Sequence, residues 1–231
     1  MTQNLFEEII APDISHIVIE DDTPVDNFQS AKQQRLLVEP LYASWSTSVS
    51  FIADSNIGLF YTTKESPIVP DAFLSLNVEM PSDWSLKQNR SYFVWEFGKV
   101  PEVCIEIVSN KEGNELSSKL GTYARIGVAC YVVFDPLKQL QPEMDGAVLK
   151  VWVLNEKKYV ERSQPFWLES VGLGLTLWEG TFEGQHDRWL RWCDRAGQPI
   201  PTGAERADQL AHKADRLAEK LRSMGINPDE V

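Results

Sequence analysis

The stretch Glu102-Val-Cys-Ile-Glu-Ile-Val-Ser109 decides the fold of this chain of 231 residues. Residues 103–108 form a continuous apolar run interrupted only by Glu106, which is typical of a strand buried on both faces. A helix is predicted over residues 114–126, where apolar side chains recur at helical spacing. A second buried run, Ala129–Phe134, follows it. Strand, helix and strand in this order form a crossover unit with parallel strands, so we expect an α/β fold.

The rest of the chain predicts further elements around this unit. A helix is expected over residues 31–47, with Pro40 kinking it or marking its first turn. A loop rich in tryptophan, proline and charge is expected over 79–100, and a helix over 185–195. Strands are expected at residues 57–62, 68–75, 149–154 and 159–162. The last two of these strands should form a hairpin.

The chain divides into three parts in this interpretation. Residues 1–30 form an acidic arm, whose apolar piece Ile14–Ile19 could be a short strand. Residues 31–200 form one substantial domain, since the hydrophobic content of 43% is ample for a core. Residues 201–231 form a C-terminal charged helix.

The charge of the chain is acidic and unevenly spread. The formal net charge is −12, and the seven acids of residues 1–31, which include no lysine or arginine, leave −12 + 7 = −5 for the remaining 200 residues. This balance argues against a broad basic face for nucleic acid. It still allows a cleft that contacts phosphate through a metal ion, a lysine and backbone amides.

Composition also bears on the compartment. No run of 18 or more apolar residues predicts a transmembrane helix, and the N-terminus lacks the pattern of a signal peptide. Cys104, Cys130 and Cys193 are scattered without a CxxC pair, and the three histidines are too far apart to form a zinc-like cluster. We therefore expect a cytoplasmic protein that does not contact membranes.

Two carboxylates and a lysine are the candidate site residues. Asp71 follows Pro70 at the start of an apolar strand, Glu106 interrupts the buried run, and Lys119 lies on the following helix. Ionised carboxylates are costly to bury unless they are paired or hold a metal. Two of them on neighbouring strands would form an oxygen-rich site for a hard cation such as Mg²⁺. The lysine could orient or help to deprotonate an attacking water.

Each of these residues also has a purely structural interpretation. An aspartate after proline is common in turns, which would explain Asp71. Glu106 could form a structural ion pair with Lys119 or Arg125. Lys119 could be a surface lysine paired with Glu115, four residues before it. The residues alone leave both interpretations open.

Residues 204–224 predict a separate helix with a heptad stripe. Its apolar residues, spaced 3, 4, 3, 4 and 3 apart, are Ala207, Leu210, Ala214, Leu217, Leu221 and Met224. A stripe of about three heptads is marginal on its own. It indicates either a coiled coil that joins two copies, or a tail that packs on its own domain or frays.

Five short motifs lie in the central part of the chain. They are Pro70-Asp71, Glu106-Ile-Val-Ser109, Lys119-x-x-x-Tyr123-Ala, Ile126-Gly-Val128 and Tyr131-Val-Val-Phe-Asp-Pro136. Together they resemble the Uma-two family, which is abundant in cyanobacteria and grouped with the PD-(D/E)XK restriction-endonuclease-like nucleases. The similarity runs roughly from residue 30 to 180, and the closing segment Gly225–Val231 is also similar to cyanobacterial members.

The resemblance implies a restriction-endonuclease-like α/β core, in which helices flank a central mixed β-sheet. It implies that Asp71 and Glu106 bind Mg²⁺ or Mn²⁺, together with the carbonyl of Ile107. A metal-activated water would then attack a DNA phosphodiester.

The lysine departs from the common pattern of that superfamily. There a lysine lies two residues after the second acid, a position that Val108 holds here. The resemblance assigns the role to Lys119, with Lys111 as the substitute candidate. Many members also carry an acid on the first helix, for which Glu39 is the candidate.

We therefore expect a Mg²⁺-dependent DNA endonuclease with Asp71, Glu106 and Lys119 as its catalytic residues. A homodimer is also expected, with the C-terminal helix as its candidate interface. One alternative is a catalytically inactive nucleic-acid- or protein-binding module of the same fold, which the acidic charge favours. Another is a structural protein that the C-terminal helix joins to a partner. Divalent-metal binding separates the enzyme from the structural protein.

Overall fold

The computed structural model describes residues 13–14, 27–109 and 114–228. Most of the predicted acidic arm and of its strand over 14–19 lies outside the described residues, as do Lys111 and the last three residues of the chain. The chain forms two compact units: residues 1–31 with 49–164, and residues 32–48 with 165–231. The sequence boundaries expected near residues 30 and 200 stay a prediction.

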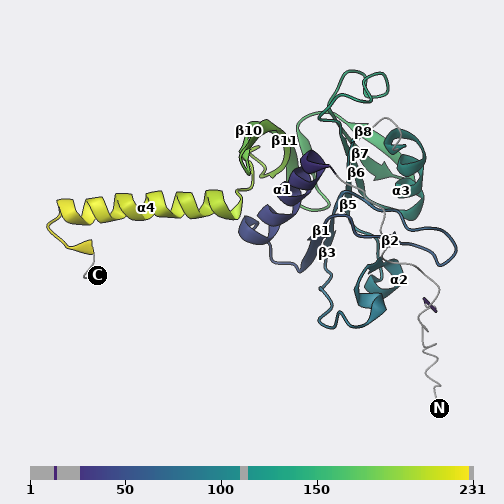
Figure 1. Cartoon of the computed structure of the whole chain (residues 1–231), viewed down its shortest axis with the longest axis horizontal. Coiled ribbons are helices and arrows are strands. Elements are labelled where there is room, and N and C mark those ends of the chain that lie inside the picture. The colour runs from purple at the N-terminus through teal and green to yellow at the C-terminus, as the bar shows by residue number, and fades with distance from the viewer. Residues whose placement is uncertain (1–12, 15–26, 110–113, 229–231) are drawn as a thin grey trace, which may run out of the picture. The chain divides into compact units, whose positions relative to one another are not determined.

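The first unit is built on a six-stranded sheet with the order β1-β3-β5-β6-β7-β8 (Figure 1). These strands are β1 (Phe51–Asp54), β3 (Ala72–Leu76), β5 (Val103–Ile107), β6 (Cys130–Phe134), β7 (Leu149–Asn155) and β8 (Lys158–Arg162). β5 and β6 pair in parallel, and the other neighbours pair antiparallel. The expected mixed sheet and its parallel pair are therefore confirmed. Every residue of β3, β5 and β6 is buried, which explains their apolar sequences.

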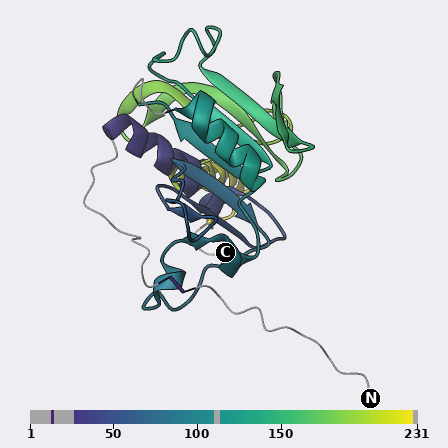
Figure 2. The same cartoon turned by 90° about the vertical axis from the view of Figure 1, so that its right-hand side faces the viewer.

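The connection from β5 to β6 is helical, as predicted. One turn of π-helix, η2 (Glu115–Lys119), continues into α3 (Leu120–Ile126). Gly127 ends α3 with a φ of 94°, a left-handed conformation that glycine adopts without strain. α3 covers one face of the sheet (Figure 1, Figure 2), and its Tyr123 is fully buried in the core there.

Short elements fill the region before β5. β2 (Leu59–Phe60) and β4 (Tyr92–Phe93) pair in parallel as a separate small sheet. The predicted loop over 79–100 is wrong in part, because β4 lies within it between η1 (Lys87–Asn89) and α2 (Val94–Phe97). Both residues of β4, Tyr92 and Phe93, are aromatic and buried, which favours a strand over an irregular loop here.

The predicted hairpin of β7 and β8 is confirmed. Its two-residue turn is Glu156-Lys157, and both residues have positive φ, 46° and 69°. This is the backbone of a type I′ turn, whose twist matches that of the flanking strands.

The second unit combines most of α1 (Phe28–Ser44) with a three-stranded antiparallel sheet in the order β11-β10-β9. The strands are β9 (Phe166–Leu168), β10 (Leu173–Phe182) and β11 (Gln185–Cys193). The buried amide of Gln33 exchanges two hydrogen bonds with the backbone of Leu190, at 2.8 and 2.9 Å. These bonds hold α1 against β11. The predicted first helix is confirmed, and Pro40 lies inside it.

The helix expected over 185–195 is wrong, because those residues form β11 instead. All nine residues of β11 pair with β10, from Gly174 opposite Cys193 to Phe182 opposite Gln185. The signal for this hairpin is the two-residue turn Glu183-Gly184, whose φ values are 45° and 77°. Aromatic and apolar residues crowd the second half of β11, and buried pairing rather than local propensity decides its conformation.

The predicted C-terminal helix is confirmed as α4 (Gly203–Ser223). A capping box starts it: Thr202 accepts from the amide of Glu205, and the carboxylate of Glu205 accepts from the amide of Thr202. α4 has no buried residue, and Leu210 and Leu217 of its stripe are 57% and 54% exposed. Within the described residues, neither α4 nor any other helix has the length and hydropathy to cross a membrane.

Candidate metal centre

The register of β3 against β5 brings the two candidate carboxylates together. These strands are antiparallel, and Ala72 lies opposite Ile105. Continuing this register by one residue places Asp71 opposite Glu106. Opposite residues of an antiparallel pair point to the same face, with Cβ atoms about 4.5–5.5 Å apart. The sheet therefore places Asp71 and Glu106 side by side, as the sequence predicts.

Glu106 is a buried carboxylate whose two oxygens are both held. The residue is 1% exposed. Its Oε2 accepts a hydrogen bond from Lys119 Nζ at 2.7 Å, and its Oε1 accepts one from the hydroxyl of Tyr123 at 2.7 Å. Both donors come from the crossover helix, so the helix that joins β5 to β6 also fixes the rotamer of Glu106.

Asp71 is held from the main chain of the neighbouring strand. Its Oδ2 accepts a hydrogen bond of 2.6 Å from the amide of Ile107. The amide and the carbonyl of Ile107 belong to the same strand end as Glu106. Ile107, whose carbonyl is the third predicted metal ligand, therefore follows Glu106 directly in β5.

The pKa of Glu106 reflects this environment. Burial raises the pKa of its carboxyl from an ordinary value of 4.5 to about 8, with the charge of Asp71 adding to the rise and Lys119 opposing it. Burial acts to lower the pKa of Lys119, but the charge and hydrogen bond of Glu106 outweigh it and leave that pKa above its ordinary value. The lysine is therefore a cation, and the metal-free protein ionises Glu106 only as the pH approaches 8, because burial and the charge of Asp71 oppose a second negative charge.

A hard divalent cation fits this set of donors. Carboxylate oxygens and a main-chain carbonyl are the ligands that Mg²⁺ and Mn²⁺ prefer. A cation between Asp71 and Glu106 would also turn their repulsion into attraction. Within residues 13–14, 27–109 and 114–228, no group of three or more histidine, cysteine, aspartate or glutamate side chains could hold a metal. The candidate centre thus depends on two carboxylates and the carbonyl of Ile107.

The structure distinguishes between the partners considered for Glu106. Lys119 forms the ion pair, whereas Arg125 bonds to Glu65 at 3.0 Å on the surface. Val108, where the common pattern has its lysine, is 1% exposed and belongs to the hydrophobic core. A lysine there could not keep its ammonium hydrated, and the cation that pairs with Glu106 is Lys119 on the following helix.

Tyr123 has a contact that the sequence interpretation did not assign, and Glu115, the alternative partner of Lys119, acts on that lysine through its charge. Tyr123 was part of a motif, but its bond to Glu106 follows only from its position four residues after Lys119 on the same helical face. Glu115 is 6% exposed, and its Oε2 has no hydrogen-bond partner among the described residues. Its charge contributes to raising the pKa of Lys119.

Glu39 lies in the second unit, on α1. Its Oε1 accepts a hydrogen bond of 2.8 Å from the amide of Gly203 at the start of α4. This contact gives Glu39 a structural role at a helix N-terminus. A role for Glu39 in the metal centre stays a prediction, as does the catalytic assignment of Asp71, Glu106 and Lys119.

Comparison with known proteins finds a matching family and similar solved structures. A family model named Uma2, described as "Putative restriction endonuclease", matches residues 15–177. The crystal structure of "a putative nuclease belonging to DUF820" from Anabaena variabilis is 15% identical, covers 63% of this chain and 73% of its own, and has a TM-score of 0.42. Among curated proteins, none matches the chain.

The raised pKa of Glu106 predicts how stability changes with pH. A carboxyl with a pKa of about 8 in the folded state and about 4.5 unfolded holds a proton only in the folded state between these values. Ionising it therefore lowers the free energy of unfolding of the metal-free protein as pH rises from about 5 to 8. Glu106→Gln cannot ionise. We expect its stability relative to wild type to rise over this range by on the order of a few kcal/mol.

Urea denaturation at several pH values, with EDTA present, measures this difference. Glu143→Gln, at an exposed loop position, is the matched control and should follow the wild type. If the stability difference instead changes only below pH 5, with the wild type becoming more stable as pH rises, then Lys119 keeps Glu106 ionised. That result would contradict the raised pKa of Glu106.

Proposed function

The chain belongs to the Uma2 family of restriction-endonuclease-like proteins, and we propose that it is a divalent-metal-dependent endonuclease that hydrolyses DNA phosphodiester bonds. The observation that carries the proposal is the placement of Asp71 opposite Glu106, with Lys119 bonded to the latter. A buried carboxylate at a strand end, beside a second carboxylate and a lysine, is costly for folding and useful for catalysis.

Asp71, Glu106 and the carbonyl of Ile107 would hold Mg²⁺ or Mn²⁺. The chemistry that a bound divalent cation supplies is Lewis-acid stabilisation of a phosphoryl oxygen and a lower pKa for water. The protein's part is to fix the ligands. Tyr123 and Lys119 hold the two oxygens of Glu106, and the amide of Ile107 holds one oxygen of Asp71.

Lys119 is suited to contact the substrate. Its side chain is 29% exposed, whereas that of Glu106, to which it donates, is 1% exposed. The ammonium has three donors, and the bond to Glu106 occupies one of them. A second donor can reach a phosphate oxygen or the attacking water, and its positive charge would stabilise the charge that develops on the phosphoryl group.

The net negative charge of the chain favours a small number of local phosphate contacts rather than a broad basic face. DNA binding would then depend on the metal, on Lys119 and on main-chain amides. We place this activity in the cytoplasm, which the three free, buried cysteines favour.

The proposal predicts DNA cleavage that requires Mg²⁺ or Mn²⁺ and stops with EDTA. Asp71→Ala and Glu106→Ala should reduce cleavage to background, because each removes a ligand. Lys119→Met should lower the rate by about 10²-fold or more, as loss of one charge-stabilising donor does. Glu143→Ala, which removes an exposed acid elsewhere in the unit, should cleave like the wild type.

The assay uses supercoiled, linear and single-stranded DNA, and calorimetry measures Mn²⁺ binding in the same variants. Metal binding that depends on Asp71 and Glu106, without cleavage of any substrate, would favour the inactive binding module instead. Cleavage that survives in all three variants would refute the assigned site.

We also propose that α4 joins two copies of the chain. The stripe of α4 keeps its heptad spacing over the whole helix, and its leucines at 210 and 217 stay more than half exposed. Such a stripe buries its apolar side chains most simply against a second copy of itself. The mixed charges on the other faces of the helix keep it soluble when it is unpaired.

Light scattering with size-exclusion chromatography tests this proposal. The wild type should have twice the mass of one chain, and Leu210→Asp with Leu217→Asp should have the mass of one, since charges in the stripe prevent pairing. Lys213→Asp, off the stripe, should stay dimeric. A wild type with the mass of one chain at the highest concentrations would refute the dimer.

A further inference from the structure

A cavity lies in the first unit, against residues of β1 and β3. Its volume is about 400 Å³, within the range of small-molecule sites. Phe73 in its wall lies two residues after Asp71 on β3, and so on the same face of the sheet. Asp54, at the end of β1, lies opposite Phe73 and also lines the cavity. Asp71 lies directly before β3, and two residues of strand span about 7 Å, so Phe73 is one such step along the chain from Asp71.

The walls of the cavity are aromatic. The rings of Tyr92 and Phe97 stack with centroids 4.3 Å apart, and Phe73 meets Tyr92 edge-on at 5.4 Å. Trp84 also lines the cavity and is 64% exposed, which is unusual for an indole. These rings offer fixed π surfaces at the wall and a further aromatic side chain at the mouth.

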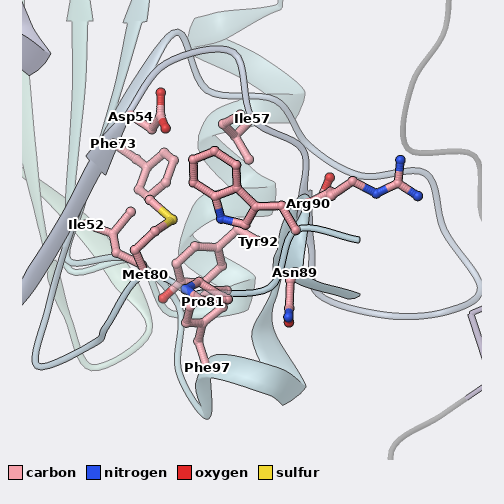
Figure 3. Close-up of a pocket in the computed structure, with 12 residues that line it drawn as sticks. Ile52, Asp54, Ile57, Phe73, Met80, Pro81, Asn89, Arg90, Tyr92 and Phe97 are labelled. Atoms are coloured by element: carbon pink, nitrogen blue, oxygen red, sulfur yellow. The ribbon is translucent and has the colours of Figure 1, made fainter. Parts of the chain in front are cut away.

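One end of this apolar cavity is acidic. In Figure 3 the carboxylate of Asp54 lies near Phe73 and Ile57, while Phe97 and Pro81 line the opposite end. Oδ1 of Asp54 accepts a hydrogen bond from the amide of Ser55 at 2.8 Å. Within the described part of the chain no cation lies within ion-pairing distance of Asp54, and burial raises its pKa. Its other oxygen can therefore accept a donor from a ligand.

Figure 3 shows the side chain of Arg90 extending away from the other labelled side chains, so its guanidinium does not point into the cavity. The cavity thus combines aromatic walls with a carboxylate acceptor inside. These features are complementary to a planar ring that carries an amino group.

We propose that this cavity binds one unstacked nucleobase with an exocyclic amino group, which donates to Asp54 while the ring stacks on Trp84. The inference rests on the proposed function, because the phosphate of the same or the adjoining nucleotide would lie at Asp71 and Glu106. A base within a duplex is stacked and paired, so occupancy requires a single-stranded or flipped nucleotide. The site therefore selects unpaired DNA, with cytosine, adenine or guanine in the cavity.

The proposal is tested by binding without turnover. Fluorescence anisotropy in Ca²⁺, which takes oxygen ligands as Mg²⁺ does, measures the affinity of the full-length protein for labelled hexanucleotides of deoxycytidine and of deoxyuridine, which differ at the amino group. The wild type should prefer deoxycytidine by about tenfold, since uracil offers no amino donor to the carboxylate.

Two variants separate the two parts of the site. Asp54→Asn should abolish or invert the preference, because its amide can donate to the uracil carbonyl. Trp84→Ala should weaken both hexanucleotides about tenfold, as loss of base stacking does, and keep the preference. Trp84 is exposed, so its truncation leaves the core intact. Glu143→Gln is the control and should bind like the wild type.

Equal affinity for the two hexanucleotides, binding of neither, or an unchanged preference in Asp54→Asn would overturn the proposal. These results are independent of cleavage. A cytidine preference without metal-dependent cleavage would leave the cavity assignment standing and remove the proposed endonuclease. Metal-dependent cleavage without the preference would support the proposed endonuclease and remove the cavity assignment.

Discussion

The buried carboxylate of Glu106 is the constraint on which the rest of this structure depends. A carboxyl group inside a sheet whose central strands are wholly buried needs hydrogen-bond partners, and the chain supplies them from the crossover helix through Lys119 and Tyr123. The helix must then lie over β5 and β6, which is also the position that buries Tyr123 in the core. One interaction thus links the parallel strand pair, the helix on its face and the candidate site.

The π-helical turn η2 places Lys119 beside Glu106. Val108, where the common restriction-endonuclease-like pattern expects a lysine, is buried in the core, and the cation beside Glu106 comes from another element. Lys119 ends the π turn, a local widening of the helix that is frequent at functional sites. From there its ammonium reaches Glu106 at 2.7 Å while the side chain keeps 29% exposure. The same side chain can therefore pair with the acid and face a substrate.

Local patterns predicted the parts of the fold that local chemistry decides. The crossover from β5 to β6, the hairpin of β7 and β8 and the helix α4 follow from apolar runs, a turn between two strands and a heptad stripe. β11 was mistaken for a helix because its two-residue turn, Glu183-Gly184, lacks the usual Asn-Gly signal of a hairpin. In the site, burial argued for a partner of Glu106. The register of β3 that brings Asp71 opposite it, and the bond from Tyr123, required the folded chain. The cavity at Asp54 joins residues from four separate segments, and no spacing in the sequence indicates it.

The central claim is that Asp71 and Glu106 share one divalent cation. Anomalous diffraction from a crystal soaked in Mn²⁺ tests it most directly. The account predicts one strong peak within coordination distance of a carboxylate oxygen of Asp71, of one from Glu106 and of the carbonyl of Ile107. The same peak should be absent from Asp71→Ala crystals. A peak elsewhere, or none while the Lys119–Glu106 ion pair stays intact at saturating Mn²⁺, would contradict the claim.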